Sequence, residues 1–163
     1  RHSMWLQNAF DAAVFSEVVP AIRADCRSVD IEIVTAGASI GAFNAVAVLC
    51  RHPEVFRTAV GMSGTYDLSD RLGGHWSDDF YFSSPIHYLP GLDEGDQLRR
   101  LRERFVALAS GRGRWEDPGE SWKMAHALGS RGVPNRVDLW SEGHDHDWPT
   151  WREMLPLYLD DLV

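Results

Sequence analysis

The hydrophobic pattern of the chain alternates between two periods in a repeating order, and this order constrains the fold more than any other feature. Apolar residues at helical spacing precede a short run rich in Ile and Val, and strand and helix patterns then alternate to the end of the chain. The predicted strands are 31–36, 57–62, 104–109 and 135–140, and the predicted helices are about 8–25, 42–50, 120–128 and 148–162. Two successive parallel strands need a crossover connection between them, and a helix is the most compact form of that connection. The sequence therefore predicts an α/β fold with a mostly parallel sheet flanked by helices.

Composition narrows the class of protein further. With 163 residues, 44% of them hydrophobic, residues 1–163 are expected to form a single domain. A net charge of −8 without a basic run argues against a nucleic-acid partner. The longest apolar stretches fall far below the ~20 residues that a membrane span needs. The 2 cysteines cannot form a disulfide framework, and they fit a reduced, cytoplasmic compartment.

A serine stands at the point where ligands bind in such sheets, just beyond the carboxyl end of a strand. Residues 37–41 read Gly-Ala-Ser-Ile-Gly, between the first predicted strand and the next helix. In the G-x-S-x-G pattern the glycines avoid collisions in a tight turn, while the serine is strained and exposes its oxygen. The plainer alternative is a glycine-rich turn in which Ser39 caps the helix. Ser63 follows the second strand without flanking glycines, and we assign it a role in a turn.

A serine hydroxyl becomes a good nucleophile only when an imidazole takes its proton and a carboxylate orients that imidazole. The loop after the fourth strand carries His144 and His146. The loop after the third strand carries Glu116 and Asp117. Serine, acid and histidine thus follow one another in the order used by one class of serine hydrolase.

Several segments together resemble the putative-esterase family of α/β-hydrolases, which includes esterase D and the mycolyltransferases, and within it a bacterial esterase branch. These segments are 37–43, 63–67, 84–85, 88–90, 113–117 and 146–151, so the resemblance covers nearly the whole chain. It implies that His146, which precedes a Trp-x-x-Trp pair, is the catalytic histidine. It also implies that Asp117 is the acid, with Glu116 as the fallback, and that the Ile40 amide is one oxyanion donor.

In one respect this chain departs from the pattern of the family that it resembles. The family normally has four further strands ahead of the first helix, and a loop among them supplies a second oxyanion amide. We therefore expect this chain to be the carboxyl-terminal part of an α/β-hydrolase, with the amino-terminal strands absent. The apolar strand that begins at Ile31 and ends at Ala36 would then be an uncovered edge. Association through this edge, or with the missing amino-terminal residues, is the expected consequence.

The predicted function is a serine hydrolase that cleaves small-molecule carboxylic esters through an acyl-enzyme, with acyl transfer to an alcohol left open. Ser39 attacks, His146 moves the proton and Asp117 orients His146, so no cofactor and no metal are implied. Segment 63–95 lacks a sustained period, and such excursions are often functional. Its aromatic residues Trp76, Phe80 and Tyr81 are candidates to wall the substrate pocket, or simply to pack the segment onto the sheet.

Two other functions remain open at the level of sequence. The first is a binding module that keeps the fold but has lost turnover, since losing an oxyanion donor costs about 10²- to 10³-fold in rate. The second is a metal-dependent hydrolase that uses His144 and His146 with His75, joined by Asp145 or Asp147.

Overall fold

The computed structural model describes residues 2–73 and 76–162. Its centre is a sheet of four strands in the order β1-β2-β3-β4, with all neighbouring pairs parallel. The strands are β1 (Ile33–Ala38), β2 (Phe56–Met62), β3 (Phe105–Ser110) and β4 (Asn135–Leu139). The predicted α/β class is confirmed, and only β1 differs by more than one residue at either end, lying two residues later than expected.

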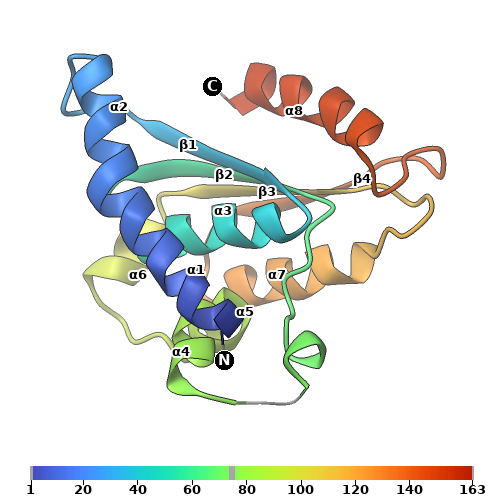
Figure 1. The fold of residues 1–163 in the computed structure, drawn as a ribbon, viewed down its shortest axis with the longest axis horizontal. Coiled ribbons are helices and arrows are strands. Elements are labelled where there is room, and N and C mark those ends of the chain that lie inside the picture. The colour runs from blue at the N-terminus through green and yellow to red at the C-terminus, as the bar shows by residue number, and fades with distance from the viewer. Residues whose placement is uncertain (1, 74–75, 163) are drawn as a thin grey trace.

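Helices cover both faces of the sheet (Figure 1). α3 (Ile40–Arg51) and α7 (Pro118–Ser130) lie on one face, and α8 (Trp148–Leu162) lies on the other. One core contains buried residues of α3, α7 and the sheet, among them Val46, Leu108 and Met124. A second, smaller core lies under α8 and includes Met154 and Tyr158. The sheet is therefore sandwiched, which places the loops beyond its carboxyl ends at one rim of the molecule.

The first helical segment is continuous but irregular. It consists of α1 (His2–Ala13), a π-helical turn η1 (Val14–Val18) and α2 (Val19–Asp25). The irregular turn lies just before Pro20, where the Val19 N–H bonds to the Val14 carbonyl. Proline has no N–H and its ring crowds the preceding turn, so a wider turn accommodates it.

The described part of the excursion after β2 contains short helical pieces, in agreement with the lack of a sustained period in segment 63–95. They are η2 (Asp70–Leu72), α4 (Asp78–Ser83), α5 (Pro85–Tyr88) and η3 (Leu89–Gly91), and they are followed by α6 (Asp96–Leu101). These pieces pack beneath α1, α3 and α7 (Figure 1). Of these pieces, α4, α5 and η3 therefore extend the layer below the sheet.

β1 is an edge strand in the described part of the chain, as expected. A groove of about 460 Å³ runs between this strand and the first helical segment, with Val14, Val18 and Ile33 among its apolar lining.

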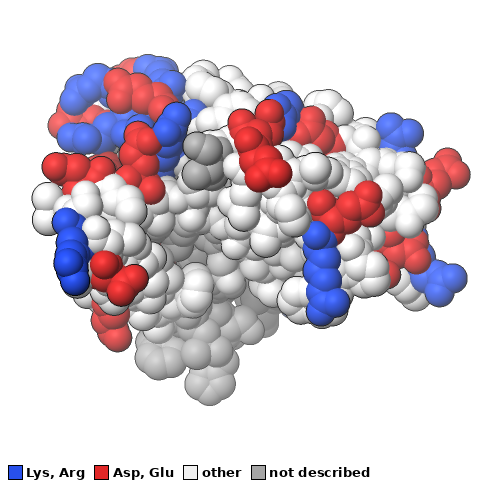
Figure 2. All heavy atoms as spheres, turned by 90° about the horizontal axis from the view of Figure 1, so that it is seen from above, with Lys and Arg blue, Asp and Glu red and all other residues white. Residues whose placement is uncertain are grey.

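On the face seen in Figure 2, acidic and basic side chains lie side by side, and the basic ones form no continuous patch. None of the described helices combines the length and the apolar character that a membrane crossing requires.

Candidate functional site

Ser39 occupies a sharp turn between β1 and α3. Its backbone has φ 56° and ψ −122°, an unusual conformation for a residue with a side chain. Such strain costs on the order of 1–3 kcal/mol and persists only where the surroundings enforce it. The Ser39 N–H is held by the Met62 carbonyl at 2.9 Å, and the Ser39 carbonyl accepts the Ala42 N–H at 3.1 Å. The side chain makes no capping hydrogen bond, so the alternative of a capping serine does not fit.

The two glycines around Ser39 have different roles. A Cβ at Gly37 would lie 2.1 Å from the Gly41 carbonyl oxygen, so this turn tolerates no side chain there. A Cβ at Gly41 would meet no atom within 4 Å, because Gly41 faces the groove beside β1. The expectation that both glycines avoid a collision is therefore wrong for Gly41 within these 163 residues.

Ile40 is the first residue of α3 and follows the strained serine directly. The first N–H groups of a helix have no acceptor inside the helix, and they carry the positive end of its dipole. The Ile40 N–H is therefore suited to an oxygen that gains negative charge next to Ser39 Oγ.

Glu116 is the buried acid of this rim. It follows β3, and its side chain is only 1% exposed. Its Oε1 accepts a hydrogen bond from Ser63 Oγ at 2.5 Å, and its Oε2 accepts one from Ser110 Oγ at 3.1 Å. The same Oε2 lies 3.9 Å from His146 Nδ1. One carboxylate thus joins the ends of β2 and β3 to the loop after β4.

Asp117 points elsewhere, in contrast to the expectation that it pairs with His146. It is the N-cap of α7, and its Oδ1 accepts the Gly119 N–H at 2.9 Å. The residue is exposed, whereas its neighbour Glu116 turns into the protein. Consecutive side chains in an extended backbone point in opposite directions. The Asp117 side chain therefore caps the start of α7, and the Glu116 side chain points into the protein. The structure thus brings the fallback acid, and not Asp117, to the histidine.

His146 and His144 have distinct surroundings. The His146 ring packs edge-on against Trp151, with ring centroids 5.1 Å apart. The backbone N–H of His146 donates to the Arg114 carbonyl. His144 Nδ1 lies 2.8 Å from Ser141 Oγ, and His144 Nε2 lies 3.4 Å from a carboxylate oxygen of Glu153 on α8. His146 therefore faces the buried acid, and His144 faces the surface of the closing helix.

Close contacts of backbone and side chain fit the loops after β3 and β4 together. A Cβ at Gly111 would lie 2.0 Å from the His144 carbonyl oxygen, and one at Gly113 would lie 2.2 Å from Asp145 Oδ1. The Gly113 N–H donates to that same His144 carbonyl at 3.0 Å. These contacts explain the Gly-x-Gly spacing and fix the loop that carries His146 against the loop that carries Glu116.

No hydrogen bond joins Ser39 Oγ to His146 among the residues that the structure describes. The two sides of the rim meet at the end of β2, where Met62 holds the Ser39 backbone and Ser63 holds Glu116. The sequence pattern assigned Ser63 only a role in a turn and left Ser110 unmentioned. Their position directly at strand ends, next to the loops that carry the candidate acid, is the signal that could have identified them.

The three aromatic candidates of the excursion lie near one another, and the ring centroids of Trp76 and Tyr81 are 6.1 Å apart. Phe80 is buried against Phe43, one turn after Ser39, and Trp76 packs edge-on against Phe80 at 5.2 Å. Tyr81 instead lines a cavity with Arg51, which ends α3. A helix of 12 residues is roughly 18 Å long, so Tyr81 lies at the far end of α3 from Ser39. Tyr81 thus lines the cavity at Arg51, and its role as a wall of a pocket beside Ser39 stays a prediction.

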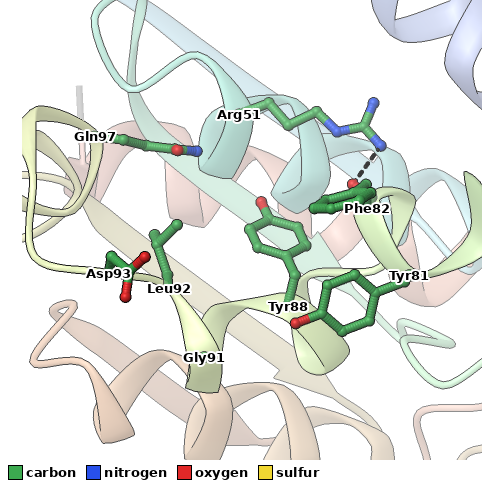
Figure 3. A pocket seen from close by; sticks show the side chains of 8 residues that line it. All are labelled: Arg51, Tyr81, Phe82, Tyr88, Gly91, Leu92, Asp93 and Gln97. Atoms are coloured by element: carbon green, nitrogen blue, oxygen red, sulfur yellow. Dashed lines mark hydrogen bonds between the residues drawn. The ribbon is translucent and has the colours of Figure 1, made fainter. Parts of the chain in front are cut away.

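This cavity, of about 450 Å³, is shown in Figure 3. Arg51 donates to the Phe82 carbonyl across its top, and Tyr88 directs its hydroxyl toward the space between Arg51 and Gln97. Burial raises the pKa of Tyr88 well above its ordinary value. The hydroxyl is thus neutral and serves as packing beneath α3.

Metal ligands do not gather in the described residues, where no group of three or more His, Cys, Asp or Glu side chains is placed to hold an ion. His75, which the metal alternative used, lies outside the described residues. The carboxyl ends of the strands thus carry a strained serine after β1, followed by the first amide of α3, a buried carboxylate after β3 and an imidazole after β4.

Comparisons with known proteins add a family and a fold. The model of a family described as Putative esterase matches residues 5–162. A ferulic acid esterase is similar with a TM-score of 0.67 and 23% identity, over 92% of this chain and 58% of the other. The enterobactin esterase FES from Shigella flexneri is similar with a TM-score of 0.69 and 21% identity, over 94% of this chain and 38% of the other.

A third similar structure is MPT51 (FbpC1) of Mycobacterium tuberculosis, with a TM-score of 0.67 and 18% identity, over 93% of this chain and 67% of the other. No curated protein matches the chain. The chain thus spans 38% to 67% of the length of these three solved structures.

Proposed function

The chain belongs to the Putative esterase family and has part of an α/β-hydrolase fold, and from this we propose that it is the catalytic part of a serine hydrolase that cleaves carboxylic esters. The single observation that carries the proposal is the backbone of Ser39. A residue held at positive φ, with a hydroxyl that caps nothing, is arranged for chemistry at the cost of stability.

In the proposed mechanism Ser39 Oγ attacks the ester carbonyl while His146 takes the hydroxyl proton. The carbonyl oxygen becomes an oxyanion, which accepts a hydrogen bond from the Ile40 N–H. Collapse breaks the bond to the alcohol, which leaves with the proton from His146, and the acyl group stays on Ser39. Water, deprotonated by His146, then releases the acid, or an alcohol takes the acyl group instead.

Glu116, rather than Asp117, is the acid in this proposal. Its carboxylate faces His146 Nδ1 from a buried position, and Asp117 is occupied by the start of α7. A carboxylate at Nδ1 orients the ring so that Nε2 receives the proton, and it stabilises the imidazolium that forms. The distance of 3.9 Å is longer than a hydrogen bond, and catalytic hydrogen bonds that are long in a free site often tighten only when substrate binds.

The test is covalent labelling with a fluorophosphonate probe, followed by turnover of a short-chain p-nitrophenyl ester. We expect the probe to label Ser39, and Ser39→Ala to remove the label and lower turnover at least about a thousand-fold. The matched control is Ser28→Ala, at an exposed serine between α2 and β1, and this variant should keep both the label and the turnover. A correctly folded chain that takes no label would favour a non-catalytic binding module over the hydrolase.

A further inference from the structure

Ser63 stands at the carboxyl end of β2 in an environment that a simple turn does not need. The residue is only 3% exposed, and its N–H continues the sheet by donating to the Ala109 carbonyl at 2.7 Å. Its φ is 49°, so a second serine at this rim has the left-handed backbone that residues with side chains rarely adopt. Such a conformation indicates that the position of this particular side chain matters.

The Ser63 hydroxyl joins two groups of fixed polarity. Trp151 Nε1 lies 2.9 Å from Ser63 Oγ, and Glu116 Oε1 lies 2.5 Å from the same oxygen. An indole N–H can only donate, and an ionised carboxylate can only accept. The single Ser63 proton must therefore point at Glu116, while its oxygen accepts from Trp151. The chain of hydrogen bonds has one direction, from α8 to the acid.

The second donor to Glu116, Ser110, has two possible acceptors. Ser110 Oγ lies 3.1 Å from Glu116 Oε2 but also 3.0 Å from the Gly111 carbonyl oxygen, and it has one proton for both. In the described residues no Lys or Arg forms an ion pair with Glu116. A carboxylate that is 1% exposed needs hydrogen-bond donors, and among the described residues Ser63 is the donor with no competing acceptor.

From these contacts we infer that Ser63 is a positioning residue, which holds the Glu116 carboxylate turned toward His146 and is itself held by Trp151. The inference rests on the proposed function, since it assigns a role within the same site. Ser63 is buried and reaches the reaction only through Glu116, so its loss affects the proton transfer and not the binding of substrate.

The experiment compares Ser63→Ala and Ser63→Gly with the unmodified chain. We expect both to lower kcat roughly ten- to a hundred-fold, the range for one lost hydrogen bond to a charged group, with KM within about two-fold. Ser110→Ala should lower kcat less.

Ser63→Gly separates positioning from structure. Glycine adopts φ near 49° without strain, so this variant relieves the backbone while it removes the hydroxyl. A purely structural serine would leave Ser63→Gly as active as the unmodified chain, and that result would overturn the inference.

A double-mutant cycle tests the direction of the chain. If Trp151 acts through Ser63, Trp151→Phe should lower kcat alone but add nothing to Ser63→Ala. Trp148→Phe, an exposed indole beside Trp151, is the matched control and should leave kcat unchanged. Losses that add in full would contradict the inference.

Fluorophosphonate labelling distinguishes the two proposals. Absence of Ser39 label in the unmodified chain would overturn the proposed function. Ser39-dependent labelling that proceeds at the same rate in Ser63→Ala would overturn only the role of Ser63.

Discussion

His146 and His144 are two positions apart and show how one loop separates two imidazoles. His146 packs on Trp151 and faces Glu116, whereas His144 packs edge-on against Trp140 at 4.9 Å and pairs with Ser141. An aromatic contact holds each ring, so moving either ring into the position of the other would lose that packing.

The first prediction at this scale compares the two histidines. His146→Ala should lower ester turnover at least about a thousand-fold, because it removes the proposed base. His144→Ala should stay within about ten-fold of the unmodified chain. Steady-state turnover of the p-nitrophenyl ester measures both, and the opposite ranking would refute the choice of His146.

The second prediction compares the neighbouring acids with the same chemical change. Glu116→Gln should lower kcat by roughly 10²- to 10⁴-fold, because the amide cannot stabilise the imidazolium. Asp117→Asn should keep both activity and unfolding midpoint, since asparagine caps a helix as well as aspartate does. Initial rates and urea unfolding of each variant decide the case. A loss confined to Asp117→Asn would restore Asp117 as the acid.

At the scale of elements, the turn from β1 to α3 is shaped by the contact between Gly37 and Gly41. The strand ends within one residue of the helix start, so the two backbones approach more closely than a Cβ allows. This approach holds Ser39 at positive φ and presents its side chain at the rim.

The third prediction concerns the two glycines, for which we expect opposite signs. Gly37→Ala should lower the free energy of unfolding by about 1–3 kcal/mol or more, because its Cβ would overlap the Gly41 carbonyl. Gly41→Ala should raise it by about 0.5–1 kcal/mol, because alanine favours a helix and has open space there. Urea unfolding at fixed pH measures both changes. Equal destabilisation by both variants would contradict the asymmetry.

At the scale of the whole molecule, a cluster of ionisable groups ties the first helical segment to the layer under the sheet. Asp11 Oδ2 lies 3.1 Å from Arg51 Nη1 and 3.2 Å from His52 Nε2, and Phe15 stacks on the His52 ring at 4.3 Å. The hydrogen bond to Asp11 raises the pKa of His52 above its ordinary value of 6.5, although burial opposes the shift. Burial acts to raise the pKa of Asp11, but His52 and Arg51 outweigh it and lower that pKa.

The fourth prediction follows from the signs of these shifts. A histidine with a raised pKa in the folded state stabilises the fold below its unfolded pKa of about 6.5, and this stabilisation is lost as pH rises through the folded pKa. The Asp11 contribution is present above about pH 4 and is lost as pH falls through its lowered folded pKa. The contact should thus stabilise most between about pH 4 and 6.5.

Urea unfolding from pH 6 to 8 checks this prediction. Relative to His52→Gln, the unmodified chain should lose stability as the pH rises. His126→Gln, an exposed histidine on α7, is the control and should follow the unmodified chain. A difference between the unmodified chain and His52→Gln that does not change with pH would contradict the assignment.

Local patterns along the chain determined the strands, their parallel pairing and the position of Ser39. Hydrophobic period and the spacing of Gly37 and Ser39 depend on neighbours within a few residues, which a sequence displays directly. Every predicted strand is present, and the two histidines stand on the predicted loop.

Tertiary structure decided which acid faces His146 and which glycine is crowded. The resemblance favoured Asp117 over Glu116, whereas in the structure Glu116 turns inward and accepts a hydrogen bond from Ser63, 53 residues away. Ser63 is in turn held by Trp151, 88 residues further along. A side chain's direction depends on the donors and cavities that distant segments bring to it, and the periodicity of its own segment carries no information about those partners.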